Sequence, residues 1–210
     1  MKEFDKKFLS KKIKYLAGVD EAGRGPLAGP VVAAAVIFKK GNQIKGVNDS
    51  KLLTEKQREK LYKKIISKAL SYSVSVVESA VIDEINILNA TMLAMKQAVD
   101  NLTIKPDIIL VDGNRIFQSD IPVIAIVKGD SKSFSIAAAS ILAKVTRDRL
   151  MKNLAREFPN YLWEQNKGYP TRQHREIIRQ FGPSPLHRKT FLKKIISDQH
   201  IFEIYNVKKS

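Results

Sequence analysis

Two acidic side chains, Asp20 and Glu21, are adjacent at the end of the apolar run 15–19. Like charges that are held together raise each other's pKa unless a cation lies between them, and a divalent metal ion is the usual partner. The sequence Gly-Arg-Gly follows at residues 23–25, and glycines leave backbone amides open to close approach by a phosphate or a sugar. One short segment therefore offers metal ligands beside a contact surface for a nucleic acid.

Two further aspartates follow apolar runs of the kind that form buried strands. Asp112 ends the run 107–111, and Asp130 comes just after the run 122–127. Strand ends that meet at one edge of an α/β sheet commonly form the site of such folds. A single aspartate at a strand end often only begins a loop. Three such strand ends together with the glycine segment favour a metal site.

The ligand types indicate which metal such a site would hold. The chain contains no cysteine, so thiolate sites, disulfides and cysteine nucleophiles are excluded. Four carboxylates are hard oxygen ligands, which suit Mg²⁺ or Mn²⁺ better than Zn²⁺. Two such ions at a separation of roughly 3.5–4 Å would activate a water molecule and stabilise the leaving oxygen of a phosphodiester.

Other candidate residues carry a weaker signal. The histidines are isolated and are expected to be surface or structural residues: His174, His187 and His200. No matching base accompanies the candidate serine nucleophiles, which are Ser131, Ser133, Ser135 and Ser140. Gly-Arg-Gly lacks the Lys-Ser/Thr ending of a Walker loop. Trp163 and Tyr161 are expected in the core. The ring of Tyr169, flanked by Gly168 and Pro170, could stack on a sugar or base or could be an ordinary loop residue.

The elements that must position these residues alternate between strands and helices in the first part of the chain. Strands are expected at residues 15–19, 30–38, 71–78, 107–111 and 122–127, and helices at residues 54–69, 89–101, 136–158, 171–180 and 188–198. Thr54 and Gln57 fit a capping box at the start of the first helix. Tyr72, Val74 and Val76 alternate with serines, so that strand is expected to have one wet face.

This pattern predicts an α/β fold with a mixed central sheet flanked by helices. At 210 residues the chain is long enough for one domain with a substantial core. Residues 1–158 are expected to form the catalytic domain, and residues 159–210 a helical portion packed on it. No stretch approaches the roughly 18 apolar residues of a membrane span. The lysine-rich N-terminus lacks the apolar region of a secretory signal, so a cytoplasmic protein, monomeric by default, is expected.

The charge of the chain indicates its partner. There are 37 Lys and Arg against 21 Asp and Glu, a net charge of +16. A surplus of this size favours a polyanion, because neutralising phosphates releases counterions. The alternative is a lysine-rich surface that is merely solvated. Charge alone therefore suggests a nucleic acid and names no reaction.

Several blocks of the sequence together resemble one known family, the type 2 ribonucleases H and specifically bacterial ribonuclease HII. These blocks are AGVDEAGRGPLAGPV at 17–31, NDSK at 48–51, VDG at 111–113, KGD at 128–130, SIAAASILAKVTRD at 135–148 and KGY at 167–169. They occur in order and cover nearly the whole chain. The resemblance implies an RNase H-like fold and a site made of four carboxylates, Asp20, Glu21, Asp112 and Asp130.

The resemblance also implies a substrate and the residues that recognise it. The substrate would be RNA in an RNA–DNA hybrid, or a ribonucleotide embedded in duplex DNA, cut on its 5′ side to leave 3′-hydroxyl and 5′-phosphate ends. Gly23, Arg24 and Gly25 would read the ribose 2′-hydroxyl through backbone groups, although Arg24 could instead brace the loop or contact a phosphate. Tyr169 would stack beneath the deoxyribose at the RNA–DNA junction, and Pro170 departs from the small residue expected after it.

Two alternatives stay open on the sequence. Ribonuclease HIII is the sister enzyme, but it carries an extra N-terminal domain and lacks Gly-Arg-Gly in the first block. A non-catalytic hybrid-binding protein could use the +16 surface alone. The four acids speak against such a protein, because carboxylates repel a polyanion unless metal ions intervene.

Overall fold

The computed structural model describes residues 1–42, 44–193 and 195–196, and its centre is one five-stranded sheet. The strand order is β3-β2-β1-β4-β5. The strands are β1 (Leu16–Ala22), β2 (Val31–Phe38), β3 (Ala69–Val77), β4 (Ile108–Asp112) and β5 (Val123–Ile126). β2 is antiparallel to β1 and β3, whereas β4 is parallel to both β1 and β5. The prediction of a mixed central sheet is confirmed.

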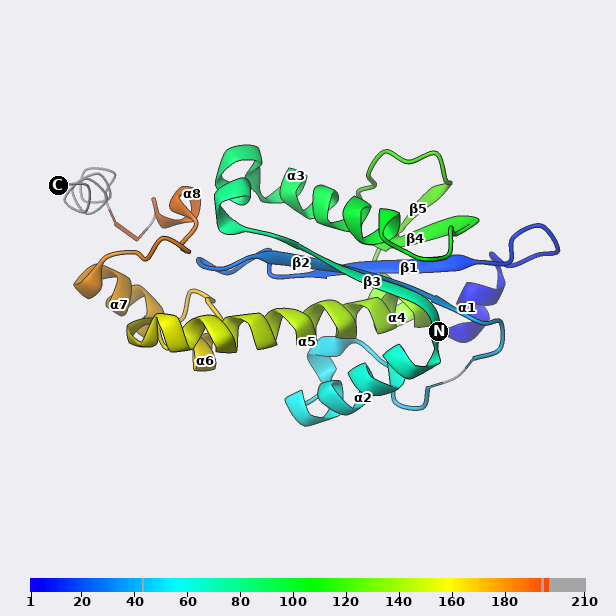
Figure 1. The fold of residues 1–210 in the computed structure, drawn as a ribbon, viewed down its shortest axis with the longest axis horizontal. Helices are drawn as coiled ribbons and strands as arrows, with labels where there is room; N and C mark the ends of the chain where they lie inside the picture. The colour runs from blue at the N-terminus through cyan, green and yellow to red at the C-terminus, as the bar shows by residue number, and fades with distance from the viewer. Residues whose placement is uncertain (43, 194, 197–210) are drawn as a thin grey trace.

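Helices cover both faces of this sheet (Figure 1). α3 (Ser79–Asp100) lies on one face, and α5 (Phe134–Glu157) lies on the other with α2 (Glu55–Lys68) packed beside it. The short helices are α1 (Lys2–Lys6), α4 (Gly129–Lys132), α6 (Trp163–Asn166), α7 (Arg172–Phe181) and α8 (Lys189–Leu192), with 3-10 turns at Ser50–Leu52 and Pro159–Tyr161. α6, α7 and α8 gather at the end opposite α1. None of the helices described here is both long and apolar enough to cross a bilayer.

The strand β2 is buried along its entire length because both of its faces are covered. Its sequence, VVAAAVIF, is a continuous apolar run rather than an alternating one. Val31, Ala33 and Ala35 belong to the core under α3, and Val32 and Ala34 to the core under α5. Strands that are covered on both faces read in this way.

The strand β3 has its wet face on the side that the sequence did not suggest. Ser71, Ser73 and Ser75 are buried, whereas Tyr72 and Val76 are 40% and 37% exposed. The small serines allow α3 to approach closely, and their hydroxyls find partners: Ser71 Oγ lies 2.9 Å from Oγ1 of Thr103, and Ser75 donates to Gln97. Serines are therefore tolerated inside because they are hydrogen-bonded.

Two helices differ from their predicted bounds for local reasons. α3 begins at Ser79 rather than at residue 89, and it is kinked at Asn86, where φ is +64°. The Asn86 side chain accepts the N–H groups of Leu88 and Asn89, so it caps a second helical segment close to the predicted start. The predicted helix 188–198 is described only as α8, which ends at Leu192, and residues 194 and 197–198 lie outside the described residues. The capping box of α2 is confirmed.

The strand β1 and the helix α5 are in direct backbone contact at Gly18. A Cβ at this position would lie within 3.0 Å of backbone atoms of Ser135 and Ile136. Only glycine fits there, so strand and helix approach more closely than side chains would allow. This contact fixes α5 against β1 just before the strand reaches Asp20.

Candidate active site

Asp20 and Asp112 are brought together by the register of β1 and β4. The two strands are parallel with Val19 paired to Val111, so the next residues, Asp20 and Asp112, lie level on neighbouring strands. Residues level in this way project from the same face of a sheet. Asp20 is the fifth residue of β1 and Asp112 is the last residue of β4. β1 therefore extends three residues beyond its predicted end at residue 19, and Asp20 lies inside the strand rather than after it.

Glu21 lies near the end of β1, where the chain turns sharply. Gly23 has φ of +100°, and a Cβ there would collide with the side chain of Arg147 and the carbonyl of Pro30. Only glycine both adopts this positive φ readily and lacks the Cβ for which there is no room. The turn places Arg24 back beside Glu21, and their side chains form an ion pair at 3.4 Å. The turn also allows Glu21 to face the same cleft as Asp20.

Asp130 reaches the other acids from the short helix α4 rather than from a strand. Lys128 adopts a left-handed conformation after β5 and turns the chain. Oδ1 of Asp112 then accepts the N–H of Gly129 at 2.6 Å and the N–H of Asp130 at 3.4 Å. Lys51 Nζ lies 3.5 Å from the Asp130 carboxylate. Asp112 therefore organises the segment that carries Asp130.

The negative charges of the acidic cluster, defined as Asp20, Glu21, Asp112 and Asp130, are not fully neutralised by nearby cations. Burial, followed by the charges of Glu21 and Asp112, raises the pKa of Asp20 well above its ordinary value. Burial and the charge of Asp112 also raise the pKa of Glu21, against the opposing effect of Arg24. The pKa of Asp130 is raised by burial and by Asp112, with Lys51 opposing. A divalent cation would relieve these repulsions.

The side chains of the cluster are turned toward partners within the protein. Oδ1 of Asp20 accepts the N–H of Glu21 at 2.7 Å, and the Ser140 hydroxyl acts to lower the pKa of this carboxyl, against the larger effects that raise it. Across the residues that the structure describes, no three acidic or histidine side chains enclose a point where a metal ion would fit. The donors are nonetheless all hard oxygens on neighbouring elements, which is the chemistry that Mg²⁺ and Mn²⁺ require.

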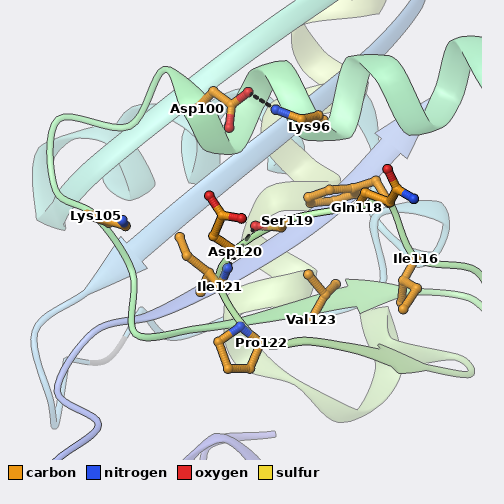
Figure 2. A pocket seen from close by; sticks show the side chains of 11 residues that line it. Lys96, Asp100, Lys105, Ile116, Gln118, Ser119, Asp120, Ile121, Pro122 and Val123 are labelled. Atoms are coloured by element: carbon orange, nitrogen blue, oxygen red, sulfur yellow. Dashed lines mark hydrogen bonds and ion pairs between the residues drawn. The ribbon is translucent and has the colours of Figure 1, made fainter.

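A cleft of about 230 Å³ joins these acids to the other predicted residues. Its lining includes Asp20, Glu21 and Asp112, the Gly-Arg-Gly segment 23–25, and Tyr169. Asp130 is not in the lining and borders the cleft through Lys51. A larger hollow of about 900 Å³ lies between the end of α3 and the chain leading into β5 (Figure 2). That hollow contains none of the four carboxylates.

Several cleft residues were not assigned a role from sequence. Lys51, Ser50, Ser140 and Lys144 all line the cleft, and the hydroxyls of the two serines lie 2.9 Å apart. Facing charges of Asp130, Asp49 and Asp20 raise the pKa of Lys51 although partial burial opposes this. A signal was available for Lys144. It is the first charged residue after the largely apolar stretch 136–143.

Tyr169 is held at the cleft by cations around its ring and by its backbone. Lys144 Nζ and the Arg147 guanidinium carbon lie 5.6 and 5.7 Å from the ring centroid. Arg147 is fully buried, and it donates to the carbonyls of Ala28, Pro30 and Lys167. The residue is 38% exposed, so part of its surface is accessible to a ligand.

Two buried histidines support the Tyr169 backbone. Nδ1 of His187 accepts the N–H of Ser184 at 2.9 Å, so its Nε2 carries the proton and donates to Nε2 of His174 at 3.2 Å. Nδ1 of His174 then donates to the Tyr169 carbonyl at 2.9 Å. Burial, with the neighbouring His174, lowers the pKa of His187 to about 3, so this chain of hydrogen bonds is neutral. His174 and His187 are buried structural residues, which is one of the two roles predicted for them. His200 lies outside the described residues.

The aromatic residues beneath the cleft are core residues, as predicted. Trp163 is fully buried and Tyr161 is 8% exposed, with their rings stacked at 5.3 Å. Nε1 of Trp163 donates to His174 at 3.2 Å. These residues therefore anchor the histidine pair.

Comparison with known sequences points to one family. A family model described as Ribonuclease HII matches residues 17–194. The ribonuclease HII of Caldicellulosiruptor bescii is 54% identical over 195 residues, which cover 93% of this chain and 95% of that protein. The ribonuclease HII of Clostridioides difficile is 53% identical over 193 residues, which cover 92% of this chain and 76% of that protein.

Solved structures give the same picture of the fold. The crystal structure of the ribonuclease H2 from Pyrococcus horikoshii OT3 is similar with a TM-score of 0.72 and 33% identity, covering 91% of this chain and 99% of that one. Bst-RNase HIII in complex with Mn²⁺ is similar with a TM-score of 0.65 at 20% identity, covering 92% and 71% of the two chains. The second likeness concerns the fold alone.

Proposed function

This chain belongs to the ribonuclease HII family and is an endoribonuclease acting on RNA–DNA hybrids, and we propose that the cleft at Asp20 is its active site. The observation that carries this proposal is the cleft lining, which combines acids from two strands, the Gly-Arg-Gly segment and Tyr169. The identity of 54% to a ribonuclease HII, against 20% to a ribonuclease HIII, argues against the sister enzyme.

The acidic cluster would hold divalent ions, Mg²⁺ or Mn²⁺ and two in number. Such ions, when bound, supply an activated water and charge stabilisation of the leaving 3′-oxygen of a phosphodiester. Asp112 keeps Asp130 in place through two backbone N–H groups, and the N–H of Glu21 holds Oδ1 of Asp20. Lys51 and Lys144 line the same cleft and would attract the scissile phosphate. No side-chain nucleophile is required, because the protein's contribution is positioning and charge.

The substrate would be recognised by the other side of the cleft. A Cβ on Gly25 would meet only the Tyr169 ring, at 3.9 Å, so the backbone there is bare beside an aromatic face. A ribose could place its 2′-hydroxyl against the backbone at 23–25 while the next sugar stacks on Tyr169. Cleavage would then fall on the 5′ side of the ribonucleotide, in hybrids and in DNA with an embedded ribonucleotide.

The helical portion from residue 159 onward would act as part of the same functional unit. It supplies Tyr169, and its backbone is joined to the segment after β1: the N–H of Leu27 donates to Gly168 at 2.8 Å, and that of Gly29 donates to Leu186 at 2.9 Å. We expect a monomer to suffice for activity, because every group named above comes from one chain.

The test uses a labelled DNA duplex that contains a single ribonucleotide. The protein is incubated with it in Mg²⁺, in Mn²⁺ or in EDTA, and the all-DNA duplex of the same sequence is the control. We expect cleavage 5′ to the ribonucleotide with either metal and none in EDTA or on the control. Binding without cleavage in all conditions would contradict the proposed site, and strong cleavage of RNA runs with weak cleavage at the single ribonucleotide would favour HIII-type specificity.

A further inference from the structure

Arg188 is a fully buried arginine whose hydrogen bonds all go to one short stretch of backbone. Nε donates to Gly29, Nη1 to Arg24 and Pro26, and Nη2 to Gly23 and Gly29, over distances of 2.6 to 3.0 Å. Its own N–H donates to the carbonyl of Leu27 at 2.8 Å. These acceptors define the recognition loop, residues 23–29. The guanidinium therefore organises this loop from inside the protein.

The bonds to Gly23 and Arg24 determine where the following N–H groups point. In a planar trans peptide the C=O and the N–H point in opposite directions. Carbonyls that face the buried guanidinium therefore turn the N–H groups of Arg24 and Gly25 outward, toward the cleft that both residues line. Neither N–H has an acceptor among the described residues. They are two free donors beside the Tyr169 ring.

We propose that Arg188 is a positioning residue for ribonucleotide recognition, which holds the N–H groups of Arg24 and Gly25 in place to bind a ribose 2′-hydroxyl. The inference rests on the proposed function of the cleft. Arg188 touches neither the substrate nor a reacting atom, because it is completely buried beneath the loop. Its effect on selectivity passes entirely through the carbonyls that it holds.

The role depends on the planar fork of arginine and not on its charge alone. A guanidinium offers five N–H donors in a fixed plane, and Arg188 uses them on four different carbonyls. A lysine has three donors on a compact point charge and cannot reach all four. Asp83 fixes the backbone that follows Arg188, because its carboxylate accepts the N–H groups of Lys189 and Thr190 at 2.8 and 3.0 Å.

The experiment measures binding selectivity for a single 2′-hydroxyl. The Asp112→Asn protein, in which cleavage is blocked, is titrated by fluorescence anisotropy with two duplexes that differ only by one ribonucleotide. The ratio of the two dissociation constants is compared with Arg188 intact, with Arg188→Lys, and with Arg172→Lys as a control. Arg172 is an exposed arginine of α7 that pairs only with Glu176 in the described structure. Circular dichroism verifies that each variant is folded.

We expect Arg188→Lys to reduce the ratio by about tenfold, the effect of losing one or two well-placed hydrogen bonds. Affinity for the all-DNA duplex should stay within about twofold, which a general loss of structure would not permit. Arg172→Lys should leave the ratio unchanged. An unchanged ratio in folded Arg188→Lys, or no selectivity with Arg188 intact, would overturn the inference.

A second variant decides the matter if Arg188→Lys does not fold. Asp83→Ala removes the acceptor for the N–H groups of residues 189 and 190 at a half-buried position outside the cleft, and it should lower the ratio in the same direction. An unchanged ratio in this variant would overturn the inference. Failure of the proposed function is distinguishable, because the wild-type protein would then leave the single-ribonucleotide duplex uncut in Mg²⁺.

Discussion

Replacing Asp112 by asparagine should make the metal-free protein more stable while it abolishes cleavage. The Asp112 charge raises the pKa of three other carboxyls, those of Asp20, Glu21 and Asp130. Asparagine keeps the side-chain oxygen that accepts the N–H of Gly129, so the segment that carries Asp130 should remain in place. The substitution therefore removes repulsion without removing a structural contact.

The magnitude follows from the number and the burial of these interactions. Two charges 4 Å apart interact by about 1 kcal/mol in water and about 4 kcal/mol at an effective dielectric constant of 20. Larger separations and partial protonation reduce this, so three such interactions should sum to about 1 to 2 kcal/mol in a partly exposed cleft. For a chain of this length, that corresponds to a rise in Tm of roughly 3 to 6 °C.

The assay is thermal unfolding of both proteins in EDTA and in Mg²⁺, at several pH values. In EDTA the raised carboxyl pKa values mean that the folded state binds more protons than the unfolded state, so these groups destabilise the protein increasingly as pH rises through their folded pKa values. The advantage of Asp112→Asn should thus be greatest at neutral pH and disappear in acid. Mg²⁺ at a hundredfold excess over its Kd adds about 2.7 kcal/mol to a protein that binds it, which should reverse the order.

Two results would refute this reasoning. If Asp112→Asn unfolds at a lower temperature than wild type in EDTA, the carboxylates do not repel one another as the structure implies. If both proteins gain the same stability from Mg²⁺, Asp112 is not a ligand. Neither result depends on measuring activity, so the site assignment is tested independently of the substrate.

Three further predictions concern recognition, packing and pH. Tyr169→Ala should reduce cleavage at a single embedded ribonucleotide more than cleavage of an all-RNA hybrid strand, and equal losses in kcat/KM would argue against a junction role. Gly18→Ala should lower the free energy of unfolding by about 3 kcal/mol, because the new Cβ meets backbone rather than a movable side chain; a denaturant titration that shows less than about 1 kcal/mol would contradict this. The lowered pKa of His187 means that the unfolded state binds more protons below pH 6.5, so stability falls as pH falls. Between pH 6.5 and pH 5, the free energy of unfolding of the wild type should fall by about 2 kcal/mol more than that of His187→Gln. Parallel stability profiles of the two proteins over this pH range would contradict this prediction.

Features that depend on local sequence were predictable. The apolar runs marked the five strands, and the acids beside them were expected close together, as Asp20 and Asp112 are on the neighbouring strands β1 and β4. The cap at Thr54 was predictable because both partners lie within three residues. The alternation in β3 was predictable, but the direction of its wet face was not. It depends on Thr103 and Gln97, which are distant in sequence.

The internal support of the cleft was not predictable from the sequence. Arg188 and Arg147 are two among 37 basic residues, and nothing in their immediate neighbours separates a buried guanidinium from a solvated one. The carbonyls that they hold are more than a hundred positions away along the chain, apart from that of Lys167. The histidine pair is similar, since His174 and His187 looked isolated and meet only because the chain folds back at Gly182.

The late position of Arg188 in the chain has a consequence for the order in which the protein is made. All four carboxylates have been synthesised once the ribosome has passed residue 130, whereas the recognition loop obtains its internal brace only 58 positions later. A nascent or prematurely terminated chain that lacks residue 188 thus carries every acidic ligand and an unsupported loop. In such a chain the backbone geometry that we propose for ribose recognition would have no internal support, although the sequence of the loop itself is complete.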